Sequence, residues 1–455
     1  MLKYFGTDGF RGEAGVTLTA EHAFKIGRFL GWYYTTNNDK SPRVVIGKDT
    51  RRSSYMFEYA IASGLCASGA DVYMLHVTTT PSVSYVVNRE NFDCGIMISA
   101  SHNKYSDNGI KLVNSRGEKM EEETLEKIEL FLDGKTELLG LDGGLPTIKG
   151  ERIGRIIDYA EGRNRYIGYL ISLSLFSYKG MRVALDCANG ASWMIAKSVF
   201  DALGASTFTI SASPDGTNIN KLCGSTDTSQ LRRFVVDNRC DIGFAFDGDA
   251  DRCIAVDENG REVDGDKLLY ILALEARHRG ELVNNTVVTT VMSNYGLHTA
   301  LENEGISHVE TSVGDKWVWE NMAATGNALG GENSGHIIFK KYATTGDGIL
   351  TAIKTMEALI SSKLTLSKLC APVTLLSQKT VNVRVADKMA VLKNTRVLEE
   401  ADKLAKELAG HGRMLLRESG TEPVIRIMIE AETEEKCTEY ADIIAKAVTD
   451  GGHCA

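Results

Sequence analysis

Short apolar runs alternate with amphipathic stretches along most of the chain, and a glycine often follows the amphipathic stretch. Residues 44–49 predict a strand by their β-branched run, 54–67 predict a helix that stops before Gly69, and 72–75 predict the next strand. The same order of strand, helix, glycine and strand begins again at Val183 and at Val287. This alternation is typical of parallel α/β units, and its three copies predict three related α/β domains with mixed sheets.

The C-terminal part has a different pattern. Residues 381–385 alternate like a half-buried strand, and helices are predicted at 395–408 and 433–448. Two short strands are expected on either side of 417–423. These elements predict a smaller α+β domain. The expected domains are 1–150, 151–254, 255–371 and 372–455.

Composition narrows the classes of function. The 455 residues carry a net charge of −9, and the sequence pI is near 5.6, which disfavours nucleic acid or a membrane surface as a partner. The nine cysteines are widely spaced without a Cys-x-x-Cys pair, so we expect reduced thiols and neither disulfides nor a zinc site. The N-terminus lacks the apolar region of a signal peptide. We therefore expect a cytoplasmic protein; a homodimer is compatible with the sequence.

A polar stretch with a reachable serine follows the apolar run 94–98, which predicts a buried strand. This stretch, 99–104 and on to 108–111, would lie past the carboxyl end of that strand, where open α/β sheets bind ligands. Ser101 is a candidate covalent carrier, and His102 and Lys111 are candidate proton carriers or charge partners. The alternative is a polar loop that happens to contain one histidine. Near the N-terminus, the glycine-rich segment 6–12 could lay Arg11 against an anion, unless it is an ordinary turn.

Three aspartates at alternate positions, Asp247, Asp249 and Asp251, come directly after the apolar strand 242–246 and before Arg252. Carboxylates this close repel one another unless a cation lies between them. Mg²⁺ fits best, because it accepts few protein ligands and leaves room for a phosphate oxygen and water. The alternative is a solvated acidic turn.

Two further loops are rich in hydrogen-bonding side chains. The loop 330–336 contains Glu332, Asn333, Ser334 and His336 between glycines, which suits a polyhydroxylated ligand such as a sugar. The segment 417–426 supplies two guanidiniums, two hydroxyls and a glycine backbone, which is the composition of a phosphate cradle. A polar turn and a charged hairpin loop are the respective alternatives.

The four loops, in this order, resemble those of the α-D-phosphohexomutase family, and the resemblance covers nearly the whole chain. The segments 313–316, 332–336 and 344–348 favour the branch of the family that acts on glucosamine phosphates. Two positions depart from the usual pattern. Lys104 stands where the family usually has proline, and Asn333 stands where that branch usually has glutamine.

The resemblance implies four domains around a central cleft and an isomerase that interconverts glucosamine 6-phosphate and glucosamine 1-phosphate through a sugar bisphosphate, which also serves as the activator. It implies a phosphate carried on Ser101 and one Mg²⁺ held by Asp247, Asp249, Asp251 and the phosphoserine. Lys111 would be the acid or base, provided that its surroundings lower its pKa, with His102, Arg11 and Arg252 beside it. The sugar would bind Glu332, Ser334, His336 and Lys316. The other phosphate would bind Arg417, Ser419, Gly420, Thr421 and Arg426.

Three other functions remain open at this point. The chain could be a phosphomannomutase or phosphoglucomutase of the same family, since a carboxylate such as Glu332 also accepts hydrogen bonds from sugar hydroxyls. It could be a phosphatase that releases phosphate from the same phosphoenzyme. A non-catalytic sugar-phosphate sensor is the least favoured, because the chain keeps both Ser101 and the three aspartates.

Overall fold

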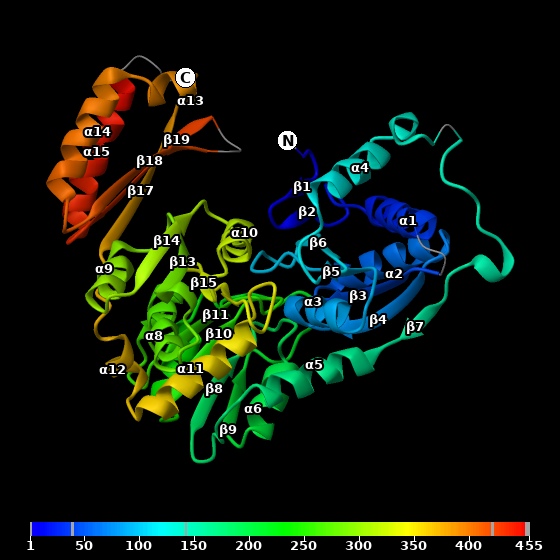
Figure 1. Ribbon diagram of the computed structural model, residues 1–455, viewed down its shortest axis with the longest axis horizontal. Coiled ribbons are helices and arrows are strands. Elements are labelled where there is room, and N and C mark those ends of the chain that lie inside the picture. Colours follow the sequence, from blue (N-terminus) through cyan, green and yellow to red (C-terminus); the bar gives the residue numbers. More distant parts are fainter. Residues whose placement is uncertain (1, 38–40, 142, 420–422, 451–455) are drawn as a thin grey trace. The chain divides into compact units, whose positions relative to one another are not determined.

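The computed structural model describes residues 2–37, 41–141, 143–419 and 423–450. The internal contacts divide the chain into two units (Figure 1). Unit 1 consists of residues 1–292 and 307–371, and unit 2 consists of residues 293–306 and 372–455. Unit 1 contains three of the four sheets, and unit 2 contains the fourth. The four domain ranges expected from the sequence stay a prediction.

The first sheet of unit 1 has seven strands in the order β1-β2-β6-β5-β3-β4-β7. Alternate residues of a strand point to opposite faces, and accordingly Val44 and Ile46 of β3 pack with helices α1 and α2, while Val45 packs with α3 on the other face. The strands are β1 (Phe5–Gly6), β2 (Gly9–Glu13), β3 (Arg43–Lys48), β4 (Asp71–Val77), β5 (Cys94–Ile98), β6 (Asp107–Asn114) and β7 (Ile156–Asp158). The helices are α1 (Ala20–Asn37), α2 (Arg52–Cys66), α3 (Thr80–Arg89), α4 (Glu122–Leu132) and α5 (Ala160–Ser172), with short 3₁₀ turns at Thr136–Leu139 and Gly150–Arg152.

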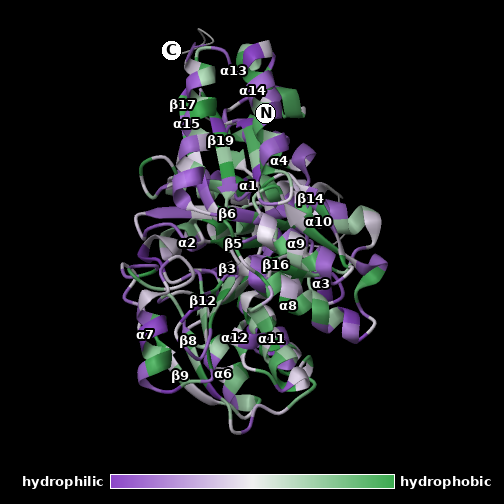
Figure 2. Ribbon diagram, turned by 90° about the vertical axis from the view of Figure 1, so that its left-hand side faces the viewer, coloured by the Kyte–Doolittle hydropathy of each residue, from purple (hydrophilic) through white to green (hydrophobic). Residues whose placement is uncertain are grey.

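The second sheet has the order β12-β11-β10-β8-β9. Its strands are β8 (Arg182–Asp186), β9 (Ser206–Ile210), β10 (Ile242–Phe246), β11 (Cys253–Val256) and β12 (Glu262–Val263), and its helices are α6 (Ile195–Ala202) and α7 (Ser229–Asp237). Helix α7 is amphipathic: Leu231 and Val235 are buried against the sheet, and polar residues cover its other side (Figure 2).

The third sheet has the order β14-β13-β15-β16. Its strands are β13 (Thr286–Thr290), β14 (Ser307–Thr311), β15 (Leu329–Gly331) and β16 (Ile337–Phe339). The helices in this part of unit 1 are α8 (Gly265–His278), α10 (Asp315–Thr325), α11 (Gly348–Ser362) and α12 (Leu366–Cys370), with a 3₁₀ turn at Val283–Asn285.

All three sheets of unit 1 share one local arrangement. Four neighbouring strands follow the order β4-β3-β5-β6, β9-β8-β10-β11 or β14-β13-β15-β16. In each sheet the first three are parallel and the fourth is antiparallel. This repetition confirms the prediction of related α/β domains with mixed sheets. The loop between the third and fourth of these strands is 99–106, 247–252 or 332–336, so the predicted serine, metal and sugar loops occupy equivalent places.

Unit 2 is the predicted smaller α+β fold. Its antiparallel sheet has the order β17-β19-β18, and helices α14 and α15 cover it through Val397, Leu404 and Ile444. Its elements are β17 (Ser377–Arg384), β18 (Arg413–Glu418), β19 (Val424–Ala431), α9 (Tyr295–Asn303), α13 (Lys388–Leu392), α14 (Thr395–Leu408) and α15 (Glu434–Asp450). Helix α9 belongs to this unit because Tyr295 N donates to Glu430 Oε2 at 2.9 Å and Asn294 Nδ2 donates to Leu376 O at 3.0 Å.

Of the two alternatives for residues 6–12, the structure has the turn, because β1 and β2 pair as an antiparallel hairpin with Thr7 and Asp8 at its turn. One expectation about local structure was wrong. The polar residues 108–111 are not part of the loop after β5 but belong to β6, where Lys111 lies opposite Met97. Both segments contain glycines and polar residues that resemble a loop locally, and only pairing with a neighbouring strand makes them extended.

Across the described part of the chain, no helix has both the length and the apolar character needed to cross a bilayer. The eight cysteines among the described residues are all free thiols.

Candidate active site

The loop after β5 presents Ser101 in a constrained backbone conformation. Ser101 has a φ of 53°, a left-handed value that residues with a side chain rarely adopt, and it is buried. Its backbone N–H donates to Ser99 Oγ at 2.9 Å. Its hydroxyl donates to Asp247 Oδ2 at 2.5 Å, so the first and second sheets meet at this serine.

Asp247, Asp249 and Asp251 converge as the sequence predicted. All three are buried, and one carboxylate oxygen from each lies within 4.8 Å of the others. Burial, together with the neighbouring charges of Asp251 and Asp249, raises the pKa of Asp247 well above its ordinary value. The loop approaches the serine so closely that a Cβ at Gly248 would lie 2.5 Å from the carbonyl oxygen of Ser101. Glycine is therefore required at this position.

The carboxylate cluster fits a divalent cation. Asp249 Oδ1 and Asp251 Oδ1 are buried, and neither accepts a hydrogen bond from any described residue. Such oxygens are costly to bury unless something neutralises them. Several hard oxygen donors together with a serine hydroxyl are the ligand type that Mg²⁺ prefers.

Lys111 partly balances this negative charge. Its Nζ lies 2.6 Å from Asp249 Oδ2 and 3.1 Å from Asp251 Oδ2. Burial alone would lower the pKa of Lys111, but the charges of Asp249 and Asp251 outweigh burial and raise it above its ordinary value. This direction is opposite to the one that the sequence argument required of a general base. The arrangement gives Lys111 the character of a proton donor or a charge partner.

The pKa of His102 is shifted in the opposite direction to that of Lys111. Its Nδ1 lies 3.4 Å from Ser101 Oγ. Burial and the charges of Arg252 and Arg11 lower the pKa of His102 to about 4, so the imidazole is neutral near pH 7. Arg11 extends from β2, where its Nη1 donates to Asn103 Oδ1 at 3.4 Å. Arg252 belongs to the loop of the three aspartates, where its backbone N–H donates to Asp247 Oδ1 at 3.2 Å.

The sugar loop lies beside the same carboxylates. His336 Nδ1 is 3.8 Å from Asp251 Oδ1, and His336 Nε2 accepts the backbone N–H of Gly346 at 2.9 Å. Glu332 Oε1 accepts the N–H of Gly314 at 3.0 Å, and burial raises the pKa of Glu332. Ser334 Oγ is buried without a hydrogen-bond partner among the described residues, which leaves it able to bind a ligand hydroxyl.

Lys316 has a different environment from the other predicted sugar ligands. It lies in the first turn of α10, and its Nζ is 3.5 Å from Glu122 Oε2 and 3.8 Å from Glu320 Oε1. Its side chain is partly exposed. In this conformation the ammonium is held by two surface carboxylates, and a sugar phosphate would have to compete with them.

The predicted phosphate residues belong to unit 2. Arg417 lies on β18 and Arg426 on β19, and the two are paired directly across the antiparallel ladder. Burial and the charge of Arg426 lower the pKa of Arg417. Like charges opposite each other in a sheet repel, so an anion bound between them would relieve this repulsion. Ser419 is buried, and Gly420 and Thr421 lie outside the described residues.

The sequence argument missed several residues that support the site. Thr80 donates to Asp249 Oδ2, and Asp315 Oδ2 lies 3.5 Å from His336 Nε2 while Asp315 Oδ1 binds Lys119 at 2.5 Å. Asp315 is part of the segment 313–316 that carried the family resemblance, so a signal existed for it. Thr80 follows β4 without any distinctive motif.

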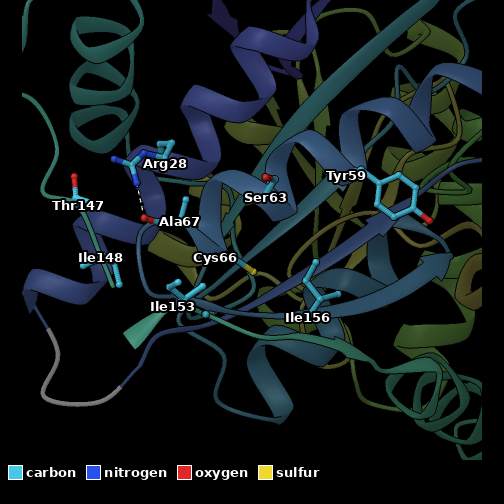
Figure 3. Close-up of a pocket in the computed structure, with 10 residues that line it drawn as sticks. Arg28, Tyr59, Ser63, Cys66, Ala67, Thr147, Ile148, Ile153 and Ile156 are labelled. Carbon is cyan, nitrogen blue, oxygen red and sulfur yellow. Dashed lines mark hydrogen bonds between the residues drawn. The ribbon is translucent and has the colours of Figure 1, made fainter. Parts of the chain in front are cut away.

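A cavity of about 680 Å³ lies elsewhere in unit 1, between helices α1 and α2 and the segment 147–156 (Figure 3). Arg28 donates to the carbonyl oxygen of Ala67 at its edge, and isoleucines supply much of its wall. Its lining includes none of the predicted site residues. This cavity is therefore separate from the predicted site at the loops that follow β5, β10 and β15.

Comparison with known proteins assigns the whole chain to one family. The four domain models of phosphoglucomutase/phosphomannomutase match at residues 2–138 (domain I), 164–260 (domain II), 264–375 (domain III) and 381–447 (C-terminal domain). The phosphoglucosamine mutase of Lachnospira eligens is 56% identical over 454 residues, which cover 100% of both chains. That of Lachnoclostridium phytofermentans is 55% identical and covers 100% of this chain and 99% of its own.

The fold is also found in solved structures. A phosphoglucomutase/phosphomannomutase family protein from Burkholderia thailandensis superimposes with a TM-score of 0.80 at 22% identity, covering 99% of this chain and 98% of its own. The order of the four matched domains, the share of the chain that they and the relatives cover, and the convergence of the three loops all support the same family. The chain belongs to the phosphoglucomutase/phosphomannomutase family of phosphohexomutases.

Proposed function

We propose that this protein is a phosphoglucosamine mutase that interconverts glucosamine 6-phosphate and glucosamine 1-phosphate, with Ser101 as the phosphate carrier. The observation that carries this proposal is the position of Ser101 Oγ, 2.5 Å from Asp247 Oδ2 in a cluster of three buried carboxylates. The names of the relatives at 55–56% identity support the choice of sugar.

In the proposed reaction, phosphate moves between Ser101 and the two ends of the sugar. The bond between Ser101 Oγ and phosphorus breaks as phosphorus bonds to a sugar hydroxyl oxygen, whose proton passes to an acceptor in the site. The resulting sugar bisphosphate reorients and returns its other phosphate to Ser101, and the sugar oxygen that loses phosphorus regains a proton. Such transfers depend chiefly on positioning and on neutralisation of charge.

The residues divide the work as follows. One Mg²⁺ held by Asp247, Asp249 and Asp251 would neutralise the negative charge of the phosphate on Ser101. His102, neutral near pH 7, can accept a proton, and Lys111, held protonated by the aspartates, can donate one. Arg11 and Arg252 add positive charge around the serine loop.

Sugar and phosphate recognition would use the remaining loops. Glu332, Ser334 and His336 supply buried acceptors and donors for sugar hydroxyls, and Lys316 would exchange its carboxylate partners for the ligand. In unit 2 the paired Arg417 and Arg426, with Ser419, supply donors for the phosphate that is not reacting. The same sequence pattern assigns Gly420 and Thr421 to this group. By analogy with the family, the sugar bisphosphate would also be the activator. The free cysteines support a cytoplasmic location.

The proposed function is tested by comparing substrates and by following the phosphate. We expect kcat/KM to be at least about tenfold higher for glucosamine phosphates than for glucose or mannose phosphates, with Mg²⁺ and bisphosphate supplied, because buried polar partners discriminate strongly when one is left unpaired. Intact-mass measurement should find a phosphate that is absent from Ser101→Ala. A preference for glucose or mannose phosphate would assign a different sugar substrate to this enzyme. Release of inorganic phosphate as the main product would indicate a phosphatase.

A further inference from the structure

The backbone of the serine loop is held by two side chains from different parts of unit 1. Arg51 Nη2 donates to the carbonyl oxygen of Ser101 at 3.1 Å and to that of Asn103 at 2.7 Å. Asn220 Nδ2 donates to the same two carbonyl oxygens, at 2.8 and 3.0 Å. Each carbonyl therefore accepts one hydrogen bond from each side chain. We call this arrangement of Arg51 and Asn220 the carbonyl clamp.

Contacts outside the serine loop fix the side chain of Arg51. It lies just before α2 and is fully buried, and its guanidinium also pairs with Asp49. Asp49 Oδ1 accepts the N–H of Arg51 at 2.9 Å and the hydroxyl of Ser54 at 2.8 Å. A buried guanidinium with this many partners has little rotational freedom. It can therefore hold the carbonyls without a further loss of side-chain entropy.

Asn220 comes from the domain that carries the aspartates. Its backbone is left-handed, with a φ of 56°, which asparagine tolerates better than most residues. Its N–H donates to the carbonyl oxygen of Ala188 at 2.9 Å, in the turn after β8. A Cβ at Gly248 of the metal loop would lie 2.5 Å from Ser101 O and 3.0 Å from Asn220 Nδ2. The clamp and the metal loop thus pack against the same carbonyl.

We propose that Arg51 and Asn220 are positioning residues for phosphoryl transfer, which hold the strained turn at Ser101 so that its Oγ stays directed at the aspartate cluster. This inference rests on the proposed role of Ser101 as phosphate carrier. Ser101 has a φ of 53°, a sparsely populated backbone conformation that persists only where the surrounding structure fixes it. Four hydrogen bonds to the carbonyls on either side of His102 supply that constraint. Asn220 also ties the serine loop to the domain that bears Asp247, so the two reacting parts keep their spacing.

The clamp is tested through Asn220, because removal of Arg51 would also leave Asp49 buried without its cation. Asn220→Asp keeps the size and the tolerance for a left-handed backbone but places an acceptor against two carbonyl oxygens. Asn220→Gly also keeps the backbone and removes both hydrogen bonds. The matched control is Asn218→Ala in the same loop, whose amide donates to Ser213 O at 3.0 Å and makes no hydrogen bond to the serine loop among the described residues.

We expect both Asn220 variants to lower kcat by roughly tenfold to a hundredfold with KM within about twofold, because small misplacements of a reacting group have effects of this size. The single-turnover rate of phosphate transfer from the phosphoenzyme to glucosamine 6-phosphate should fall by the same factor. Asn218→Ala should match the wild type in both. The midpoint of thermal unfolding shows whether each variant is folded.

The outcomes separate this inference from the proposed function. If the wild type carries phosphate on Ser101 and the folded Asn220 variants transfer it at the wild-type rate, the positioning role of the carbonyl clamp is wrong. The assignment of Ser101 as phosphate carrier is then unaffected. If the wild type carries no phosphate and Ser101→Ala is active, the proposed function is wrong as well. If both Asn220 variants fail to fold, or raise KM without lowering kcat, Asn220 has a structural or binding role and the inference is overturned.

Discussion

Asp249 uses its two carboxylate oxygens differently. Oδ2 accepts from Thr80 and pairs with Lys111 at 2.6 Å, while Oδ1 is buried without a hydrogen bond from any described residue. Oδ2 is thus oriented by the protein, and Oδ1 is left for a cation. This division is what a metal ligand requires, because a second partner that fixes the carboxylate strengthens metal binding.

Asp249→Asn should weaken Mg²⁺ binding and lower kcat, each by roughly tenfold to a hundredfold. The substitution removes one negative charge and replaces one carboxylate oxygen with an amide NH₂ group that cannot bind a cation. Calorimetric titration with Mg²⁺ and the Mg²⁺ dependence of kcat measure the two effects. Asp237→Asn, on the exposed side of α7, is the control and should change neither. Full activity of the wild type in excess chelator would show that the three aspartates are not a catalytic metal site.

Lys111 lies on strand β6 with its ammonium against Asp249 and Asp251. Lys111→Met keeps most of the buried stem and removes the charge, so it should lower kcat by roughly 10²–10⁴-fold, the range for loss of a general acid, with a much smaller change in KM. Steady-state kinetics with glucosamine 6-phosphate measure both. The control is Lys127→Met, at a partly exposed lysine of α4 that pairs with Glu123, and this variant should behave as wild type. A large rise in KM with kcat preserved would assign Lys111 to binding instead.

At the scale of elements, the candidate residues lie on the same loop of the same strand arrangement in three sheets. Each of the three sheets in unit 1 has three parallel strands followed by an antiparallel one, and the loop between the third and the fourth contains the candidate residues. The β5 loop provides Ser101, the β10 loop provides the aspartates, and the β15 loop provides Glu332, Ser334 and His336, which are proposed to bind the sugar. Equivalent loops in related domains can therefore converge while each carries different chemistry.

Helix α11 gives a prediction about stability and pH. Its N-cap, Asp347, is buried, accepts the N–H of Leu350 at 3.0 Å and accepts the hydroxyl of Tyr166 at 2.7 Å. Burial raises the pKa of Asp347 from 3.8 to about 6. The folded state thus binds a proton more tightly than the unfolded chain. The stability that this proton contributes is present below the unfolded pKa of 3.8 and is lost as the pH rises through about 6.

Asp347→Asn should remove this pH dependence while it keeps the cap, because asparagine is also a good N-cap residue. Relative to the wild type, the variant should gain about 1.3 kcal/mol of stability when the pH rises from about 5 to about 7, because pH 5 lies about one unit below the folded pKa of Asp347 and one pKa unit corresponds to about 1.4 kcal/mol. Thermal unfolding at both pH values measures the difference. Asp387→Asn, at the exposed N-cap of α13, should show no such change. Identical pH profiles for wild type and Asp347→Asn would contradict the prediction.

The elements that the sequence predicted are those with strong local patterns. The run 94–98 and the run 242–246 are apolar at every position, and the structure has strands with these same bounds. Strand β6 was missed because Asn108 and Gly109 favour loops locally, and its pairing with β5 and β2 decides its conformation. Asn220 was missed for a related reason. It lies 119 residues from Ser101 in the sequence, and no motif marks a contact that arises only when two domains pack.

At the scale of the whole molecule, the two units carry different parts of the proposed chemistry. Unit 1 contains the phosphate carrier, the aspartates and the sugar loop, and unit 2 contains Arg417 and Arg426 on neighbouring strands. A bisphosphate that reorients must present either end to Ser101, so its other end needs a binding site that accepts both orientations. Two paired guanidiniums suit this task, because they recognise phosphate and make few demands on the sugar between the two ends.

Arg426→Ala should therefore weaken the affinity for either glucosamine phosphate by about 1.5–3 kcal/mol, the typical contribution of a charge-assisted hydrogen bond, which is roughly a tenfold to a hundredfold rise in KM. Because the cradle would serve both orientations, the rise should be similar in the forward and reverse directions. The control is Arg396→Ala, an exposed arginine of the same unit whose partner is Asp450. It removes the same charge from unit 2 and should leave KM unchanged, which excludes a general electrostatic effect. If KM rises for only one of the two isomers, Arg426 binds a single orientation, and the other phosphate pose must use different residues.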